Sequence, residues 1–154
     1  MIEWQWAEFG ELTTGELYQV LKLRQHVFIV EQNCIYEDID DLDEAAWHLI
    51  GWRIEISGAR TIAAYLRVLG PGVKYKESSI GRVIVSQAAR GVGLGKVLMA
   101  QAISIMNEKL SNTPVKLSAQ YHLEGFYRDY GFETVSDPYD EDGILHVEML
   151  KRTD

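Results

Sequence analysis

Three glycines at alternate positions form the part of this chain best suited to hold a ligand. Gly91, Gly93 and Gly95 lie between Ile80–Val85, which is rich in β-branched residues as strands are, and Lys96–Ile103, which consists of good helix formers. A glycine-rich turn between a strand and a helix gathers bare backbone N–H groups at the helix N-terminus, where the helix dipole also favours negative charge. The spacing therefore predicts a binding site for a phosphate-bearing ligand.

Two common phosphate-binding motifs do not fit these glycines. The nucleoside triphosphate loop needs G-x-x-x-x-G-K-[ST], but Arg90 replaces its first glycine and Val97 replaces its Ser or Thr. The dinucleotide fingerprint needs G-x-G-x-x-G and an acidic residue at the end of the next strand, and no acidic residue ends Val115–Ala119. A glycine-rich turn without a ligand is the remaining alternative. It is disfavoured because glycines cost backbone entropy wherever unusual dihedral angles are not required.

A second motif follows downstream, since residues Phe126–Phe132 read F-Y-x-x-x-G-F. Together with Val85–Gly95, which looks like a coenzyme A pyrophosphate loop, it resembles the GNAT (GCN5-related N-acetyltransferase) superfamily. The N-terminal half resembles the ElaA-like branch of that family in an acid-rich loop, in His48 and in the run Leu23-Arg24-x-x-Val27-Phe28-x-x-Glu31-Gln32.

The resemblance implies a fold as well as a family. We expect a single N-acetyltransferase domain over residues 1–154 with an α+β fold. Its central sheet would be mixed and mostly antiparallel, with about seven strands, and about four helices would flank it. The sheet is expected to splay where coenzyme A binds.

The resemblance also implies a reaction. Acetyl-CoA would be the co-substrate, without a metal, and the primary amine of a small molecule or peptide would attack its thioester directly. No nucleophilic Ser or Cys is then needed, so we expect Cys34 to be a small buried or half-exposed residue. Tyr127 matches the tyrosine that protonates the departing thiolate in many members, although it could simply pack beside Leu123 and Tyr130. The residues expected to bind coenzyme A are Val83, Ile84, Val85, Arg90, Gly91, Val92, Gly93, Leu94, Gly95, Lys96 and Tyr127.

The amine must lose a proton at neutral pH, to a general base or through water. Glu31 is the first candidate. His122 is another, because it follows the strand expected at Val115–Ala119, and a helix cap is its alternative role. His48 is the third, although a lone histidine in a strand is more often structural. Glu31 and His48, together with Arg24, are also expected to line the acceptor site.

Arg24 falls on the apolar face of the first expected helix, and a buried arginine must be paired. We expect a salt bridge to Glu31 or to the acidic loop, and a contact to a substrate carboxylate is the alternative. The net charge of −8 is concentrated in two acidic stretches, residues 37–44 and 137–142. These are expected to be solvated loops, and attraction of a cationic substrate is the alternative.

Composition excludes several classes of protein. A chain of 154 residues is long enough for one domain and too short for two ordinary ones. No apolar run approaches the roughly 20 residues that span a bilayer, and the N-terminus lacks a secretory pattern. One cysteine cannot form an internal disulfide, so a cytoplasmic location is expected. No basic stripe suggests nucleic acid and no Cys/His cluster has metal-site spacing. We expect a monomer or a homodimer.

Two other functions stay open. Acyl-homoserine-lactone synthases share the fold and carry an Arg-x-x-x-Phe segment followed by spaced acidic residues, which Arg24, Phe28 and residues 37–44 echo. Those enzymes generally lack a glycine loop of this quality. The other alternative is a non-catalytic acyl-CoA-binding module, against which the intact loop and Tyr127 argue.

The elements that must position these residues follow from hydrophobic periodicity and turn signals. A capping box at Thr13–Glu16 predicts a helix that begins near Thr14, and a short helix should end at Gly131. The helix after the glycines should bury Leu94, Val97, Leu98, Ala102, Ile105 and Met106. Strands are expected at Ile2–Phe9, Trp47–Ile56, Thr61–Leu69, Ile80–Val85, Val115–Ala119, Phe132–Val135 and Ile144–Leu150.

Overall fold

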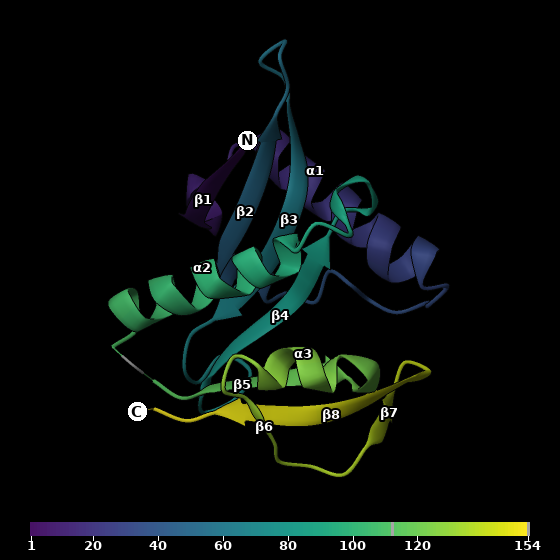
Figure 1. Ribbon diagram of the computed structural model, residues 1–154, viewed down its shortest axis with the longest axis vertical. Coiled ribbons are helices and arrows are strands. Elements are labelled where there is room, and N and C mark those ends of the chain that lie inside the picture. Colours follow the sequence, from purple (N-terminus) through teal and green to yellow (C-terminus); the bar gives the residue numbers. More distant parts are fainter. Residues whose placement is uncertain (112, 154) are drawn as a thin grey trace.

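A computed structural model describes residues 1–111 and 113–153, and its centre is one mixed sheet (Figure 1). The strand order is β1-β2-β3-β4-β5-β8-β6, with β7 pairing on β8, and β4–β5 is the parallel pair among otherwise antiparallel ones in this part of the chain. The strands are β1 (Ile2–Glu8), β2 (Ala46–Ile54), β3 (Arg60–Leu69), β4 (Ser78–Val85), β5 (Val115–Gln120), β6 (Glu133–Thr134), β7 (Tyr139–Glu141) and β8 (Ile144–Lys151).

The described residues form three α-helices, which are α1 (Thr14–Arg24), α2 (Leu94–Lys109) and α3 (Glu124–Arg128). The predicted α+β class is confirmed, with eight strands in place of about seven and three α-helices in place of about four. The additional strand is β7, which lies inside the second acidic stretch. That stretch was predicted to be a solvated loop, and this is wrong for residues 139–141 because they pair with β8.

The first helix begins where the capping box predicts. The Thr13 side chain accepts a hydrogen bond from the Glu16 N–H at 3.1 Å, and the Glu16 carboxylate accepts one from the Thr13 N–H at 2.9 Å. Beyond Arg24 the chain continues into a π-helical segment, η2 (Gln25–Glu31). This wider turn carries α1 toward the cleft described below.

Two hydrophobic cores lie on opposite faces of the sheet. Helices α2 and α3 cover one face, in front of the strands in Figure 1, and α1 with η2 covers the other. Leu66 and Val68 of β3 pack into the first core, whereas Ile50 and Trp52 of β2 pack into the second. Burial of apolar surface on both faces holds the strands and helices in fixed relative positions.

The buried face of α2 differs from the prediction at two residues, Val97 and Met99. Leu98, Ala102 and Met106 are buried as expected, and Met99 is fully buried beside them. The prediction for Val97 is wrong, because its side chain is 45% exposed. Successive helical residues are about 100° apart, so a face centred between residues 98 and 99 turns residue 97 toward solvent.

The two halves of the sheet part between β4 and β5. These strands pair only at Ser78↔Val115 and Ser79↔Lys116. Beyond those two pairs the strands diverge, as Figure 1 shows at the centre of the sheet. The predicted splay is confirmed, and it leaves the edge of β4 from Ile80 to Val85 without a neighbouring strand on the β5 side.

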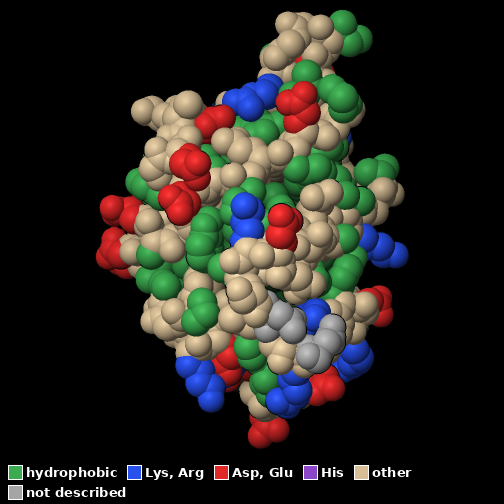
Figure 2. Space-filling model, turned by 90° about the vertical axis from the view of Figure 1, so that its left-hand side faces the viewer, with side chains coloured by type: hydrophobic (Ala, Val, Ile, Leu, Met, Phe, Trp, Pro, Cys, Tyr) green, Lys and Arg blue, Asp and Glu red, His purple; other side chains and the backbone are tan. Residues whose placement is uncertain are grey.

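Charged side chains are mixed on the face that lies to the left in Figure 1. Figure 2 shows Lys and Arg there as scattered side chains among Asp and Glu. No helix in the described part of the chain is both long enough and apolar enough to cross a bilayer.

The corrected face of α2 leads to a paired test of stability. Leu98→Ala should lower the free energy of unfolding by about 2–5 kcal/mol, because it leaves a cavity in the core. Val97→Ala should change it by less than about 0.5 kcal/mol, because that side chain is largely solvated. Urea unfolding followed by fluorescence measures both, and equal losses in the two variants would contradict the observed face.

Candidate functional site

Two cavities lie along the gap between β4 and β5, and they meet. The first, the loop-side cavity, has a volume of about 500 Å³, and the second, the hairpin-side cavity, about 140 Å³. The loop-side cavity is lined among others by Val27, Glu31, Val85, Arg90, Gly95 and Phe126. The hairpin-side cavity is lined among others by Lys74, Arg82, Ser118, Glu141, Asp142 and His146. Both share Phe28, Gln32, Val83, Gln120, Leu123 and Tyr127.

The glycine loop lies beside the loop-side cavity, which Arg90 and Gly95 line. Gly91 and Gly93 have φ angles of 87° and 78°, which side-chain-bearing residues rarely adopt, and Gly93 caps α2. Within the described part of the chain, the backbone N–H groups of residues 91–95 donate no hydrogen bond to another backbone group, and Lys96 is the first to bond back. Five free donors at a helix N-terminus make the anion-binding arrangement that the spacing predicts.

Gly95 serves the cavity in a different way. Its backbone is in the ordinary helical region, and a Cβ built there would lie 3.6 Å from the Val85 side chain and 3.8 Å from Phe126. Those are ordinary contact distances, so alanine fits without strain. A larger side chain would fill the space that Val85, Phe126 and Gly95 enclose.

A β-bulge bends β4 where the two cavities meet. The β3–β4 register shifts between Tyr65 and Arg67, and Arg82 has a φ angle of 54°, which is rare for a residue with a side chain. The bulge re-aims the backbone of Val83, which lines both cavities. A backbone acceptor on the open edge of β4 is used by a side chain, since Arg90 Nε–H donates to the Val85 carbonyl oxygen at 3.0 Å.

Tyr127 lies where the two cavities meet. Its side chain is 6% exposed and packs edge-on against Phe126 and Phe132. Burial raises the pKa of the phenol to about 12. Among the described residues no side chain or carbonyl bonds to its hydroxyl, so the O–H is free to donate to a molecule in either cavity. The packing considered for Tyr127 is observed, and its chemical role stays a prediction.

Glu31 and Arg90 form an ion pair at the loop-side cavity. Arg90 Nη1 and Nη2 lie 2.7 Å and 3.1 Å from the two Glu31 carboxylate oxygens. The guanidinium lowers the pKa of the Glu31 carboxyl from its ordinary value, which makes it a weaker base. His122, in the short turn Tyr121–Leu123, lines the same cavity. Glu31 and His122 therefore lie on the side of the glycine loop.

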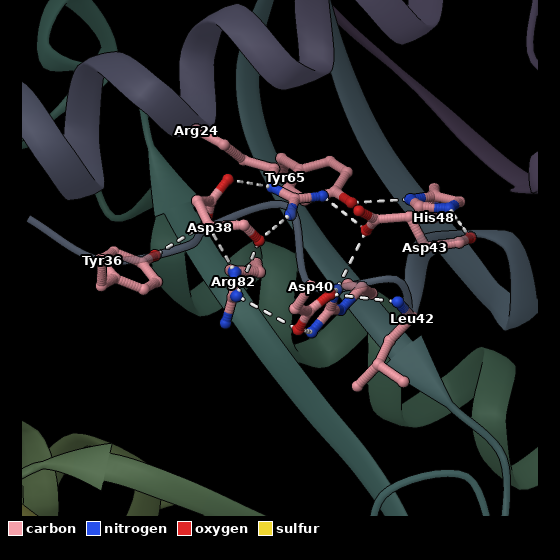
Figure 3. A network of polar contacts seen from close by, with 10 residues as sticks. Arg24, Tyr36, Asp38, Asp40, Leu42, Asp43, His48, Tyr65 and Arg82 are labelled. Atoms are coloured by element: carbon pink, nitrogen blue, oxygen red, sulfur yellow. Dashed lines mark hydrogen bonds and ion pairs between the residues drawn. The ribbon is translucent and has the colours of Figure 1, made fainter. Parts of the chain in front are cut away.

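Arg24 does not line either cavity. Its side chain is fully buried, and Nε and Nη1 donate to the carboxylates of Asp38 at 2.9 Å and Asp43 at 2.6 Å (Figure 3). The expected salt bridge to the acidic loop is confirmed, and the alternative partner Glu31 bonds to Arg90 instead. The acidic stretch 37–44 is not simply a solvated loop, because Asp38 and Asp43 are only 5% and 6% exposed.

Two further arginines complete this cluster, and they come from the sheet. Arg67 of β3 bonds to Asp40 at 2.8 Å and to Asp43 at 3.0 Å, and Arg82 of β4 pairs with Asp38 Oδ1 at 2.7 Å. We call these six residues the arginine–aspartate cluster: Arg24, Arg67, Arg82, Asp38, Asp40 and Asp43. It ties the acidic loop to α1, to β3 and to the bulge of β4.

His48 belongs to this buried region. Its Nε2–H donates to the Asp43 carbonyl oxygen at 3.0 Å, and its Nδ1 accepts from the Tyr65 hydroxyl at 2.7 Å (Figure 3). Burial lowers the pKa of the imidazole. The side chain is fully buried and lines neither cavity. Its contacts are those of a satisfied structural histidine.

The hairpin-side cavity was missed at the sequence level, although one signal was present. Asp142-Gly143 is a two-residue hairpin turn with φ angles of 52° and 84°, and it joins Glu141 of β7 to Ile144 of β8. The hairpin directs Glu141, Asp142 and His146 to the cavity wall. The D-G dipeptide before an alternating apolar run was sufficient to predict it. Cys34 is buried as expected, and its thiol bonds to the Asp142 carbonyl oxygen at 3.2 Å.

Comparison with known proteins places this geometry in a family. Residues 30–153 match the family model of the acetyltransferase (GNAT) domain. Protein ElaA of Escherichia coli strain K12 is 42% identical over 98% of this chain and 97% of that protein, and a UPF0039 protein of Synechocystis is 40% identical over 98% and 96%. The crystal structure of an acyl-CoA N-acyltransferase from Pseudomonas aeruginosa matches with a TM-score of 0.90 at 42% identity, covering 98% of this chain and 99% of the other. The crystal structure of Escherichia coli ElaA matches with a TM-score of 0.90 at 40% identity, covering 99% and 100%.

The arginine–aspartate cluster predicts how stability depends on pH. Burial alone would raise the pKa of Asp43, but the guanidiniums of Arg24 and Arg67 outweigh it and hold the pKa below its ordinary value. A lowered folded-state pKa stabilises the fold above the unfolded value of about 3.9, and that stability is lost as the pH falls through the folded pKa. Asp43→Asn should therefore cost about 3–5 kcal/mol near pH 7, and the difference from the unchanged protein should shrink toward low pH.

Urea unfolding from neutral to acid pH measures this effect. Glu133→Gln is the matched control, because Glu133 and Arg152 are 70% and 66% exposed and 3.7 Å apart, so their pair should contribute less than about 1 kcal/mol. A constant difference between Asp43→Asn and the unchanged protein at all pH values would contradict the assigned pairing.

Proposed function

This chain belongs to the GNAT acetyltransferase family, and we propose that it transfers an acetyl group from acetyl-CoA to a primary amine. One observation carries the proposal. The loop-side and hairpin-side cavities meet at Val83 and Tyr127, so a thioester and an amine can approach the same point from opposite sides. The family membership supports acyl-CoA as the donor.

The loop-side cavity has the features that an acyl-CoA donor requires. The pyrophosphate would accept hydrogen bonds from the free N–H groups of residues 91–95, at the positive end of α2. The pantetheine arm would lie along the open edge of β4, near Ile84 and Val85, as an added strand does. In the free protein Arg90 Nε–H donates to the Val85 carbonyl oxygen. A pantetheine amide that took over this carbonyl would displace the guanidinium, which could then bind a phosphate of coenzyme A.

The reaction needs one bond formed and one broken. The ammonium of the acceptor loses a proton, its nitrogen lone pair forms a bond to the thioester carbon, and the C–S bond breaks with its electron pair on sulfur. The thiolate takes a proton, and the amine nitrogen loses its second one. A backbone N–H at the β4 bulge, near Val83 to Val85, would stabilise the oxyanion of the tetrahedral intermediate.

Tyr127 is the proposed acid. With a pKa raised to about 12 the phenol stays protonated at neutral pH, so it is a donor and not a base. Its free hydroxyl at the meeting point of the cavities supports donation to the departing sulfur. The proton that leaves the amine nitrogen balances the one that Tyr127 supplies.

Glu31 is a poor candidate for the base in this arrangement. Its carboxylate is bound by Arg90, its pKa is lowered, and it lies on the donor side. We propose that Glu31 positions Arg90. His122 also lines the loop-side cavity and not the hairpin-side cavity, so it lies on the donor side as well, next in sequence to Leu123, which reaches both cavities.

An acyl-homoserine-lactone synthase would need a site for S-adenosylmethionine, and a non-catalytic module would need no acid. The resemblance to synthases rests on Arg24 and the acidic stretch, both of which are engaged in the arginine–aspartate cluster. Thermal stabilisation by acetyl-CoA, with none from S-adenosylmethionine, is expected, because a ligand that binds only the folded state stabilises it. Stabilisation by S-adenosylmethionine alone would favour the synthase.

Replacement of Tyr127 separates chemistry from packing. Tyr127→Phe should lower kcat about 10²- to 10⁴-fold, the range that general acids contribute, with little change in the KM for acetyl-CoA. Tyr130→Phe is the control, since its hydroxyl bonds to the Lys96 carbonyl oxygen and its side chain lines neither cavity. Steady-state thiol release measures both, and full turnover in Tyr127→Phe would reduce Tyr127 to packing.

Gly95 tests the donor site without disturbing the backbone. Gly95→Val should raise the KM for acetyl-CoA by about tenfold or more, because the side chain enters the loop-side cavity where the donor must lie. Gly15→Val is matched to it, since Gly15 is likewise the second residue of its helix and faces open space. A KM unchanged in Gly95→Val, or raised equally in both variants, would count against the donor assignment.

A further inference from the structure

The hairpin-side cavity limits what the acceptor can place inside it. Its volume of about 140 Å³ is close to that of a cavity that holds benzene, about 150 Å³. A group of about six non-hydrogen atoms therefore fits between its walls. The acceptor site therefore accommodates a small molecule, or one end of a larger molecule.

The walls of this cavity carry charges of opposite sign on different elements. Lys74 comes from the loop between β3 and β4, whereas Glu141 and Asp142 come from the β7–β8 hairpin. Glu141 is the strongest opposite charge acting on Lys74. Even so, no described carboxylate lies within the 4.0 Å of an ion pair with Lys74. Lys74 and Glu141 therefore line one cavity from different elements without forming an ion pair.

The other cation at this wall is already neutralised. Arg82 forms ion pairs with Asp38 and Asp40, so its charge is compensated within the arginine–aspartate cluster. Among the described residues Lys74 has no carboxylate partner, and its ammonium lies 5.4 Å from the centre of the Tyr75 ring. Loss of solvent around this ammonium lowers the pKa of the group. An ammonium that is partly desolvated and unpaired is stabilised by an anion that enters the cavity.

The acidic wall is held in place in a complementary way. His146 Nδ1–H donates to the Ile144 carbonyl oxygen at 2.7 Å, so His146 Nε2, which lies 3.2 Å from Glu141 Oε2, donates to that carboxylate only when the imidazole carries both protons. Tyr139 stacks on His146 and bonds to Ser118. Ser118 Oγ–H lies 3.5 Å from Glu141 Oε1, at the limit of a hydrogen bond. Because this contact is long, a ligand ammonium can replace it at that oxygen.

We propose that the acceptor is a small zwitterion, an amine that also carries a carboxylate, and that it binds between Lys74 and Glu141. Its carboxylate pairs with the Lys74 ammonium, and its ammonium donates to Glu141. This inference rests on the proposed acetyl transfer. Glu141 then receives the proton that the ammonium loses before the amine nitrogen attacks the thioester at Val83 and Tyr127.

Comparing each amino acid with its methyl ester measures how much the substrate carboxylate contributes to turnover. The full chain with acetyl-CoA is assayed by thiol release against glycine, β-alanine and γ-aminobutyrate, each beside its own methyl ester. The ester keeps the amine and removes the negative charge. Because the ester amine is less basic, more of it is unprotonated at neutral pH, so a preference for the acid cannot arise from amine basicity. For the acid of the best-fitting length we expect kcat/KM to exceed that of its ester by about tenfold or more.

Variants assign that preference to Lys74. Lys74→Met should lower kcat/KM for the acid to that of the ester and leave the ester unchanged. Lys76→Met is the control, since Lys76 belongs to the same loop but does not line this cavity. Lys74→Glu should reverse the preference, so that diamines of matched length become better acceptors than the amino acids. Lys74 lies in the loop between β3 and β4, outside both hydrophobic cores, so these changes remove no core side chain.

The outcomes separate the inference from the function on which it rests. Equal turnover of acids and esters, or a preference for acids that survives in Lys74→Met, would overturn the zwitterion inference and leave acetyl transfer intact. Failure to acetylate every acid and every ester, although acetyl-CoA stabilises the protein, would likewise overturn the zwitterion inference alone. Absence of any thermal stabilisation by acetyl-CoA would contradict the proposed function itself and the inference with it.

Discussion

The site depends on a short parallel pairing in the middle of the sheet. Strands β4 and β5 share only two residue pairs and then diverge. An unpaired strand edge normally invites association with other chains, but here the open edge of β4 is enclosed by η2, α2 and α3 and becomes the wall of two cavities. The glycine loop follows β4 directly, so the same strand leads from the junction of the cavities to the anion site at α2.

The divergence requires something to hold β4 in place without its neighbour. The arginine–aspartate cluster does this from the far side, because Arg82 sits at the bulge and is bound by two aspartates of the acidic loop. Isolated buried charges are unfavourable, and only mutual pairing makes such a group tolerable. The cluster therefore fixes the strained backbone of β4 at the point where the thioester is proposed to react. Its role is positional, and none of its charges remains free for a substrate.

The elements with strong local signals could be predicted from the sequence, whereas contacts between distant segments could not. The capping box at Thr13 and the glycines at 91–95 act through backbone geometry within a few residues, so their spacing suffices. The ion pair of Glu31 with Arg90 joins residues far apart in the chain, and hydrophobic periodicity does not predict such a contact. The same holds for the pairing of residues 38–43 with Arg67 and Arg82. The β7–β8 hairpin had a local signal in Asp142-Gly143, which the surrounding acidic residues obscured.

Amide hydrogen exchange with and without acetyl-CoA tests the central claim most directly. Acetyl-CoA bound at the diverging strands should slow exchange for residues 91–95 and for the amides of β4 that face β5. The β1–β2 pair, which lies at the opposite edge of the sheet, should be unchanged. Protection confined to other segments, or its absence from the glycine loop at saturating acetyl-CoA, would contradict the assignment of the diverging strands as the donor site.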